Sequence, residues 1–375
     1  MISNNLIYKS YYSWWKNINK SVLFLIIILF GLGLFFSLVS TSLIASDKLN
    51  TNSYYFFIKH FLFIGAGVFF IIFFSSLNYK DLAKVSIILF VIFLFFLILV
   101  PFFGVEVKGS KRWIDLFFLP RFQPIELLKP FLIVFIANIL SDENNKNIYY
   151  KYFLSFLIII PVILLLIIQP DIGQSLLIFL TWLSLIFISG ISLVVFFIFF
   201  GIILSLLLYL IFFIPKFEYI KYRVESFFNP VLGTHNFQSD KASEAIINGG
   251  FFGKGIGEGV LKNKVPEAHT DYIVAVISEE FGAIIIIVLM MIFLFFIYQV
   301  FKKLYFEKSN KVRLVLVGSI TIILLQALIH IGVNIRLFPT TGMTLPFLSY
   351  GGSSLIGSAL IAGVILNFTR KDSTR

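Results

Sequence analysis

The stretch from Phe251 to Gly282, FFGKGIGEGVLKNKVPEAHTDYIVAVISEEFG, places a glycine-rich polar segment directly before a long apolar run. The polar part ends in the sequence Pro266 to Asp271, and the apolar part carries Glu279 and Glu280. Ionisable residues inside membrane helices are costly and usually mark functional sites. We therefore predict that this stretch joins the start of a membrane span to a reactive site.

The composition of the whole chain is that of a polytopic membrane protein. Hydrophobic residues make up 59% of its 375 residues and charged residues 13%, with a mean hydropathy of +0.98, whereas soluble domains carry about 25% charged residues. The chain has no cysteine, which excludes disulfides and thiolate sites. Its net charge of +11 comes from cations scattered through short loops, which favours contact with lipid head groups and phosphate-bearing substrates rather than nucleic acid. The polar N-terminal segment has no small-residue cleavage site, so we expect no removable signal peptide.

Apolar runs of the length that crosses a bilayer, about 20 residues, predict an all-α membrane helix bundle with ten transmembrane helices. One run is too long for a single helix, and we divide it at Ser189 and Gly190. We treat residues 1–375 as one integral membrane domain. The predicted spans are Ser21 to Ile44, Tyr54 to Leu77, Val85 to Phe103, Phe122 to Leu140, Tyr152 to Ile168, Ile172 to Ser189, Ile191 to Ile214, Asp271 to Val300, Val312 to Ile335 and Leu345 to Phe368.

Two connections are longer than the rest and fall on the same face, Gly104 to Arg121 and Pro215 to Thr270. The second is a large loop between spans seven and eight, in which we expect short amphipathic or re-entrant helices. Cations in the short loops on the other face favour placing both termini in the cytoplasm. The two long loops then face outward, and their own cations are expected to contact something anionic.

The first charged constellation contains Arg112, Arg121, Glu126 and Lys129. Glu126 and Lys129 are three residues apart, so they share a helix face. They could simply pair and join two helices. Alternatively, Arg112, Arg121 and Lys129 line a cavity for a diphosphate, with Glu126 orienting them.

Two aspartates, Asp171 and Asp271, precede apolar runs. Asp171 could be a plain helix N-cap. Asp271 could also be a cap, or it could act as a general base whose pKa is raised by partial desolvation. Glu267 and His269 could orient Asp271 or bind a divalent ion, although their spacing matches no metal motif. The alternating glycines from Gly253 to Gly259 more often mark turns or close packing than a phosphate cradle.

The last polar segment, Phe338 to Ser354, has prolines that break a helix and small residues from Gly351 to Ser354 that allow close backbone approach. Broken helices at membrane depth are tolerated where they line a cavity. We interpret His330, just upstream, as a packed polar residue.

These stretches, in this order, resemble the SEDS family of shape, elongation, division and sporulation proteins. The resemblance is closer to the division member than to the elongation member. The chain departs from the family pattern at two positions, with Ile125 where the family commonly has Ser and Ser110 where it commonly has Ala. The matching pieces are KGSKRW, RFQPIELLK, QPDIGQSLL, YRVESFFNP, GGFFGKGIGEG, PEAHTDYIVAVISEEFG and PTTGMTLPFLSYGGSS.

The resemblance implies a glycosyltransferase that polymerises lipid II into peptidoglycan at the division septum of the bacterial cytoplasmic membrane and releases undecaprenyl diphosphate. It implies as partners a class B penicillin-binding protein (an FtsI-like transpeptidase) and other divisome proteins. It suggests Mg²⁺ or Mn²⁺ as an assisting ion and no organic cofactor, and it assigns no metal ligands.

Carried over residue by residue, the resemblance makes Asp271 the catalytic carboxylate and places the family's cavity carboxylate, lysine and arginine on Glu126, Lys129 and Arg121. We predict substrate-binding roles for these three and for Arg112, His269, Ser349, Gly351 and Gly352. Three other readings stay open: the elongation polymerase, which shares the chemistry; a lipid II flippase, for which Asp271 would be dispensable; and a non-catalytic scaffold. No inverted repeat is visible to favour a transporter.

Overall fold

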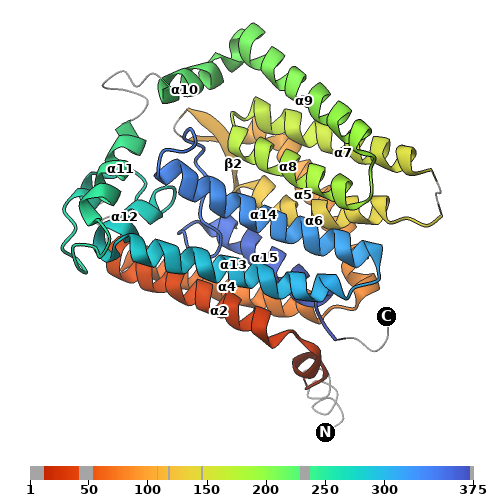
Figure 1. Ribbon diagram of the computed structural model, residues 1–375, viewed down its shortest axis with the longest axis horizontal. Coiled ribbons are helices and arrows are strands. Elements are labelled where there is room, and N and C mark those ends of the chain that lie inside the picture. Colours follow the sequence, from red (N-terminus) through yellow and green to blue (C-terminus); the bar gives the residue numbers. More distant parts are fainter. Residues whose placement is uncertain are drawn as a thin grey trace.

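The computed structural model describes residues 12–41, 54–107, 109–116, 119–144, 147–228 and 237–371, and these form a bundle of long apolar helices (Figure 1). The long helices of the bundle are α2 (Lys20–Phe36), α4 (Tyr55–Ser76), α5 (Tyr79–Phe103), α6 (Pro124–Leu140), α7 (Ile148–Ile168), α8 (Ile172–Ile188), α9 (Leu193–Phe213), α13 (Ala283–Tyr305), α14 (Asn310–Asn334) and α15 (Gly352–Phe368). A short π-helix, η1 (Ser37–Thr41), continues α2.

The predicted membrane bundle is confirmed. Six of the described helices are long and apolar enough to cross a bilayer, and α8, α15 and the Leu193–Leu206 part of α9 are shorter apolar segments. Helix α6, which has 17 residues and carries Glu126 and Lys129, is not among them. The predicted end of the first span, Ile44, lies outside the described residues, as do Lys108 and the segment 229–236.

Helices α14 and α15 form the centre of the bundle, between the α2, α4 and α13 layer and the α5 to α9 layer (Figure 1). Small residues let the helices approach closely. A Cβ atom on Gly357 would lie 2.5 Å from the Glu126 carbonyl oxygen, and one on Gly67 would lie 3.1 Å from Ala359 Cβ. Helix packing through small residues is usual where lipid tails provide no hydrophobic drive between helices.

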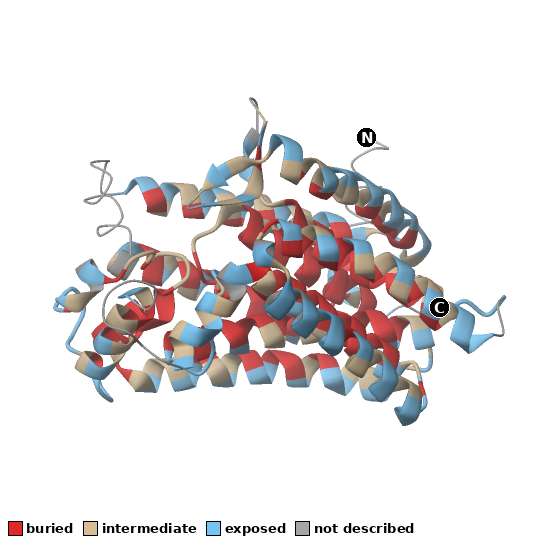
Figure 2. Ribbon diagram, turned by 90° about the horizontal axis from the view of Figure 1, so that it is seen from above, coloured by how far each residue is buried: buried red, intermediate tan, exposed pale blue. Residues whose placement is uncertain are grey.

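The peripheral helices expose large apolar side chains along their outer faces. Figure 2 shows exposed residues around the margin and buried residues at the centre. Phe69 on α4, Phe95 on α5 and Leu294 on α13 are each more than half exposed. Such a surface would be a liability in water and is the expected one for a bundle surrounded by lipid.

The connection from Gly104 to Arg121 was not predicted to contain strands, but it forms a small antiparallel sheet in the order β1-β2-β3. The strands are β1 (Val105–Val107), β2 (Ser110–Leu116) and β3 (Leu119–Phe122), with Val105 opposite Trp113 and Ile114 opposite Phe122. Along β2, Lys111 and Asp115 are exposed, whereas Ile114 is buried. The sheet therefore determines which side chains of this loop face the bundle.

The long loop before span eight contains the short helices that the sequence predicted. They are η2 (Pro215–Phe217), α10 (Glu218–Phe228), α11 (Phe237–Gly249) and η3 (Leu261–Lys264), and Figure 1 shows α10 and α11 at the end of the bundle opposite the C-terminus. The predicted single span from Asp271 to Val300 is wrong, because the chain forms α12 (Ile273–Phe281) and then α13, with Gly282 between them.

Gly282 breaks this span because its backbone has φ +79°, and a Cβ there would lie 2.2 Å from the Phe251 carbonyl oxygen. The glycine-rich loop wraps the end of α12. Glu279 Oε1 accepts hydrogen bonds from Asn248 Nδ2 and the Leu261 amide at 2.9 and 2.8 Å, and Glu280 Oε1 accepts one from the Gly257 amide at 3.2 Å. The glycines of this loop therefore allow turns and close packing, as expected. The side chains of Glu279 and Glu280 accept the hydrogen bonds that hold the loop against α12.

The last span also differs from its prediction, since α15 begins at Gly352 rather than at Leu345. Residues 345–351 run without helix toward the cavity described below. At the opposite end of the bundle the described ends of the chain meet, because the Lys371 amide donates to the Asn17 carbonyl at 2.9 Å.

Candidate active site

A cavity of about 440 Å³ opens at the end of the bundle that carries the small sheet and the long loop. Its wall comes from β2, α10, the 267–272 turn and the broken segment around Thr340 to Gly351. The charged residues that line it are Arg112, Glu126, Arg223, Glu267 and Asp271. Residues that lie far apart in the sequence thus place two guanidinium groups and three carboxyl groups around one cavity.

The turn that carries Asp271 is held by its main chain. The carbonyl of His269 accepts a hydrogen bond from the Tyr350 amide at 3.0 Å, and the carbonyl of Thr270 accepts one from Ser349 Oγ at 2.8 Å. The carbonyl of Asp271 accepts one from Asn334 Nδ2 at 3.1 Å. Three successive carbonyls are therefore paired with other elements, which fixes the path of the turn at the cavity wall.

Asn334 was missed by sequence reasoning, although it is fully buried at the end of α14. Its amide group also donates to the His330 carbonyl at 2.8 Å, and its Oδ1 accepts from the Ala275 amide at 3.2 Å. Asn334 therefore supplies the first turn of α12 with an acceptor from outside the helix. The N-cap position itself is Tyr272, so Asp271 is not the N-cap residue of α12.

Arg112 reaches the cavity from β2 and is held by the turn before α8. Its guanidinium donates to the carbonyls of Gln169, at 3.3 Å, and Pro170. A Cβ added to Gly342 would lie 3.6 Å from Asp271 Oδ2 and 3.7 Å from Arg112 Nη1. The carboxylate and the guanidinium therefore converge on the same side of Gly342, whose φ of +71° suits a residue without a side chain.

Asp171 is the N-cap residue of α8, as predicted, and it also contacts Arg112. Its Oδ1 accepts the Gln174 amide at 3.5 Å, as an N-cap does, and lies 3.8 Å from Arg112 Nη1. Its Oδ2 accepts from Gln123 Nε2 at 2.8 Å. Burial raises the pKa of the Asp171 carboxyl, and the Arg112 charge opposes that shift. Asp171 thus orients Arg112 from behind the cavity.

Glu126 and Lys129 form a buried ion pair at the base of the cavity, with 2.7 Å between Oε2 and Nζ. Gln174 Nε2 donates to Glu126 Oε1 at 2.5 Å, and Lys129 Nζ donates to Gln326 Oε1 at 2.9 Å. The predicted pairing on one helix face is present and extends to α8 and α14. Glu126 lines the cavity, whereas Lys129 lies below it with 1% of its surface exposed.

Other predicted binding residues lie around the cavity rather than in its lining. Arg121 is about half exposed on β3 and pairs with Asp115 at 3.1 Å. The His269 ring packs on Phe56 and Tyr350, with centroid distances of 5.3 and 5.8 Å. Arg121 departs from the predicted cavity because the strand pairing directs it to the outer surface of the sheet.

The residues from Ser349 to Gly352 hold the broken segment close to the bundle. Ser349 is buried, and its Oγ accepts from the Leu345 amide at 2.9 Å while donating to Thr270. Gly351 lines the cavity. A Cβ on Gly352 would lie 2.6 Å from the Phe63 ring, so α15 starts where only glycine fits without movement.

His330 on α14 is packed as predicted, with its Nδ1 2.7 Å from the Met343 carbonyl oxygen.

Arg223 was not selected as a site residue, although it belongs to the motif YRVESFFNP. It projects from α10 into the cavity, and its Nη1 donates to the Thr340 carbonyl at 3.4 Å. The sequence signal was weak, because Arg223 is one of two cations in the amphipathic segment of α10, with Lys221, and only the folded loop brings it to the same cavity as Arg112. Among the described residues, no group of three His, Cys, Asp or Glu side chains could hold a metal ion.

The family model for cell cycle proteins of the FtsW, RodA and SpoVE type matches residues 20–374. The chain belongs to the FtsW/RodA/SpoVE family. Among curated members of this family, the probable peptidoglycan glycosyltransferase FtsW of Caulobacter vibrioides is 32% identical over 96% of this chain and 90% of its own. Stage V sporulation protein E of Bacillus subtilis is 35% identical over 88% of this chain and 91% of its own.

Solved structures of the FtsW/RodA/SpoVE type share the fold. A chain from a peptidoglycan synthase complex that coordinates polymerization and crosslinking matches with a TM-score of 0.76 and 23% identity, covering 94% of this chain and 97% of its own. The rod shape determining protein RodA of Thermus thermophilus matches with a TM-score of 0.68 and 24% identity, covering 94% and 96%. This family member is thus a multi-pass membrane protein with the RodA architecture.

Proposed function

We propose that the protein is a peptidoglycan glycosyltransferase of the division type, which polymerises lipid II into glycan strands. The observation that carries the proposal is the convergence of Asp271 and Arg112 on one side of Gly342, in a cavity that also receives Arg223. Family membership, and relatives named peptidoglycan glycosyltransferase FtsW over most of the chain, support the same reaction.

In the proposed reaction Asp271 is the general base. A sugar hydroxyl of the acceptor is a poor nucleophile at neutral pH, so the Asp271 carboxylate takes its proton as the oxygen bonds to the anomeric carbon of the donor. The bond from that carbon to the lipid diphosphate breaks in the same step. A single displacement inverts the anomeric centre, and no second carboxylic acid is required because diphosphate is a good leaving group.

Arg112 and Arg223 are proposed to stabilise the charge that develops on the departing diphosphate. Arg112 suits this role because its hydrogen bonds to two carbonyls orient the guanidinium before substrate binds. The fixed turn at residues 269–271 provides the complementary orientation of the base.

We propose Mg²⁺ or Mn²⁺ only as an ion that arrives with the diphosphate. The described residues contain no cluster of three metal-ligating side chains, and Mg²⁺ is commonly held by one or two carboxylates together with substrate phosphates. Such an ion would neutralise phosphate charge, and Glu126, Glu267 and Asp271 are the carboxylates that line the cavity.

The proposed topology places the cavity on the outer face of the cytoplasmic membrane at the septum, with both termini in the cytoplasm. The charge of the short loops supports this orientation. We also propose a class B penicillin-binding protein as the partner that cross-links the new strands, which the likeness to a chain of a peptidoglycan synthase complex supports. Undecaprenyl diphosphate is the proposed lipid product.

The test is polymerisation of purified lipid II by the full-length protein with its cognate transpeptidase, comparing the wild type with Asp271→Asn. The expected result is long glycan strands from the wild type, and lipid II binding without polymer from the variant. Glu258→Gln, on the exposed glycine-rich loop, is a matched control. Equal polymerisation by wild type and Asp271→Asn would refute the base, and movement of lipid II across vesicles without polymer would favour the flippase reading.

A further inference from the structure

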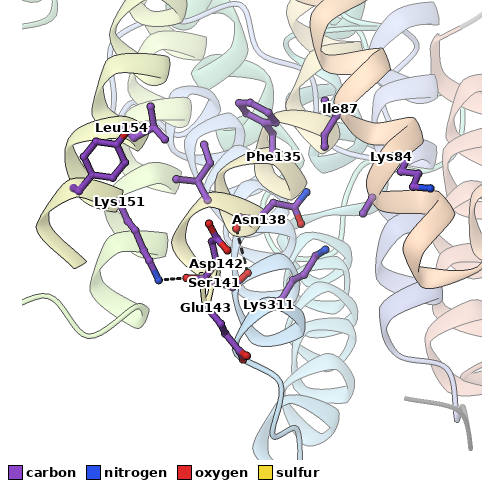
Figure 3. A pocket seen from close by; sticks show the side chains of 13 residues that line it. Lys84, Ile87, Phe135, Asn138, Ser141, Asp142, Glu143, Lys151, Leu154 and Lys311 are labelled. Carbon is purple, nitrogen blue, oxygen red and sulfur yellow. Dashed lines mark hydrogen bonds between the residues drawn. The ribbon is translucent and has the colours of Figure 1, made fainter. Parts of the chain in front are cut away.

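A second cavity, of about 570 Å³, lies at the opposite end of the bundle from Asp271. Lys84 near the start of α5 and Lys311 near the start of α14 line it, whereas the other end of α14 contributes Val333 to the first cavity. Figure 3 shows Lys84, Lys151 and Lys311 extending from three different helices around this pocket. It therefore lies on the membrane face that also holds the described ends of the chain.

Within the described part of the chain, the three lysines have no carboxylate partner. Among the described residues, no ion pair joins Lys84, Lys151 or Lys311 to Asp or Glu. Lys151 Nζ donates to the main-chain carbonyl of Asp142, and Lys311 Nζ lies 4.9 Å above the Tyr79 ring. Their ammonium charges are thus held near the cavity without being neutralised.

Two carboxylates do belong to the lining, Asp142 and Glu143. Both are exposed on the loop between α6 and α7, and neither lies within ion-pair distance of the three lysines. Three cations facing two solvated carboxylates leave the cavity with a net positive charge. An anionic group is therefore the complementary ligand.

The deeper wall is apolar. Ile87 of α5, Phe135 and Ile139 of α6, and Leu154 of α7 line it. Asn138 of α6 also lines the cavity, and its buried Oδ1 accepts no hydrogen bond within the described part of the chain. A cavity with lysines at its mouth and hydrocarbon on its wall matches an amphiphile better than a free ion.

We propose that this cavity binds the head group of an anionic glycerophospholipid in the leaflet on the side of the chain ends. Lys84, Lys151 and Lys311 contact the phosphate, and an acyl chain packs on Phe135 and Leu154. Basic pockets between membrane helices on the cytoplasmic side recognise lipid phosphates in this way. The site is separate from the proposed polymerisation cavity and does not depend on its chemistry.

Native mass spectrometry of the full-length protein in detergent tests the proposal, with dioleoylphosphatidylglycerol and dioleoylphosphatidylcholine as probes. The variant is Lys84→Gln with Lys151→Gln. The control is Lys80→Gln with Lys308→Gln, which removes two exposed cations from the same face outside the lining. Lys311→Gln is tested separately, because Lys311 also packs on Tyr79. Glycerol 3-phosphate and inorganic phosphate form a further arm that lacks acyl chains.

The expected result is one tightly retained phosphatidylglycerol per protein, with phosphatidylcholine bound much more weakly. The Lys84→Gln, Lys151→Gln variant should weaken retention about tenfold or more, while the control pair keeps it. The proposal is overturned if the two lipids bind alike, if the lysine variant retains phosphatidylglycerol as well as the control does, or if the soluble phosphates bind as tightly as the lipid.

Discussion

At the scale of single residues, the proposed base is positioned mainly by groups that bind its main chain. Asn334 contacts the Asp271 carbonyl, the first turn of α12 and the His330 carbonyl at once. An amide side chain is suited to this position because it donates and accepts together. The carboxylate can then face the cavity while the turn that carries it stays fixed.

Asn334→Ala should lower the turnover of lipid II about tenfold to a hundredfold, because a small displacement of a catalytic group has effects of that size. Lipid II binding should change little, and the free energy of unfolding should fall by about 1–3 kcal/mol. Asn367→Ala is the matched control, since Asn367 is equally buried and bonds the Phe74 and Leu77 carbonyls far from the cavity. Equal turnover in the two variants would contradict the positioning role.

The buried pair of Glu126 and Lys129 differs from the exposed pair of Arg121 and Asp115 in what its loss should cost. Lys129→Met leaves the Glu126 carboxylate buried without its ion partner, which costs about 3–5 kcal/mol. Arg121→Gln should cost about 0–1 kcal/mol, since that pair is nearly half exposed. Thermal unfolding in detergent measures both. Adding Glu126→Gln to Lys129→Met should restore much of the loss, and failure to do so would contradict the ion-pair explanation.

At the scale of elements, the break between α12 and α13 brings the end of α12 against the glycine-rich loop that precedes it in the chain. Lys254 and Gly255 donate main-chain hydrogen bonds to the carbonyls of Glu279 and Glu280 at 2.9 and 3.0 Å. The end of α12 is thus satisfied by the preceding loop instead of by continuation of the helix. This arrangement makes α12 a separate support for the Asp271 turn.

Gly282→Ala should destabilise the protein by about 1–3 kcal/mol, because φ at this position is +79° and the new methyl group would meet the Phe251 carbonyl. Gly65→Ala is the control, since Gly65 lies within α4 and a Cβ there has no neighbour within 4 Å. Its unfolding temperature should stay level or rise slightly, given the helix propensity of alanine. Limited proteolysis would show whether Gly282→Ala loosens residues 250–260, and an unchanged pattern with unchanged stability would count against the strained turn.

At the scale of the whole molecule, the two cavities lie at opposite ends of one buried centre. Helix α14 connects them, with Lys311 near its first residue and Asn334 at its last. Of the six candidate spans it is the most enclosed, with 78% of its apolar window buried. The proposed chemistry and the proposed lipid site therefore share a rigid element and face opposite sides of the membrane.

The absence of native cysteine allows a direct test of this orientation. Glu258→Cys and Glu143→Cys each introduce one thiol at an exposed position, at opposite ends of the bundle. In spheroplasts a membrane-impermeant maleimide should label Glu258→Cys, and it should label Glu143→Cys only after permeabilisation. Cytoplasmic placement of the termini would be wrong if the accessibility were reversed.

Long apolar segments predicted a membrane bundle and the course of most of its helices, because a bilayer demands such segments and their length is visible residue by residue. The sequence also predicted several local roles, such as the pairing of Glu126 with Lys129 and the cap at Asp171, since both depend on spacing along one helix. The order of the polar motifs, resembling one family, placed Asp271 among the candidates.

Only the tertiary structure decided which charges meet. Strand pairing in the 104–122 segment turned Arg112 toward the cavity and Arg121 away from it. Folding of the long loop brought Arg223 to the cavity, and Asn334, 63 residues after Asp271, became its main-chain partner. These contacts join residues that lie far apart in the sequence, so neither periodicity nor spacing along the chain predicts them. They depend on how the helices and loops pack together.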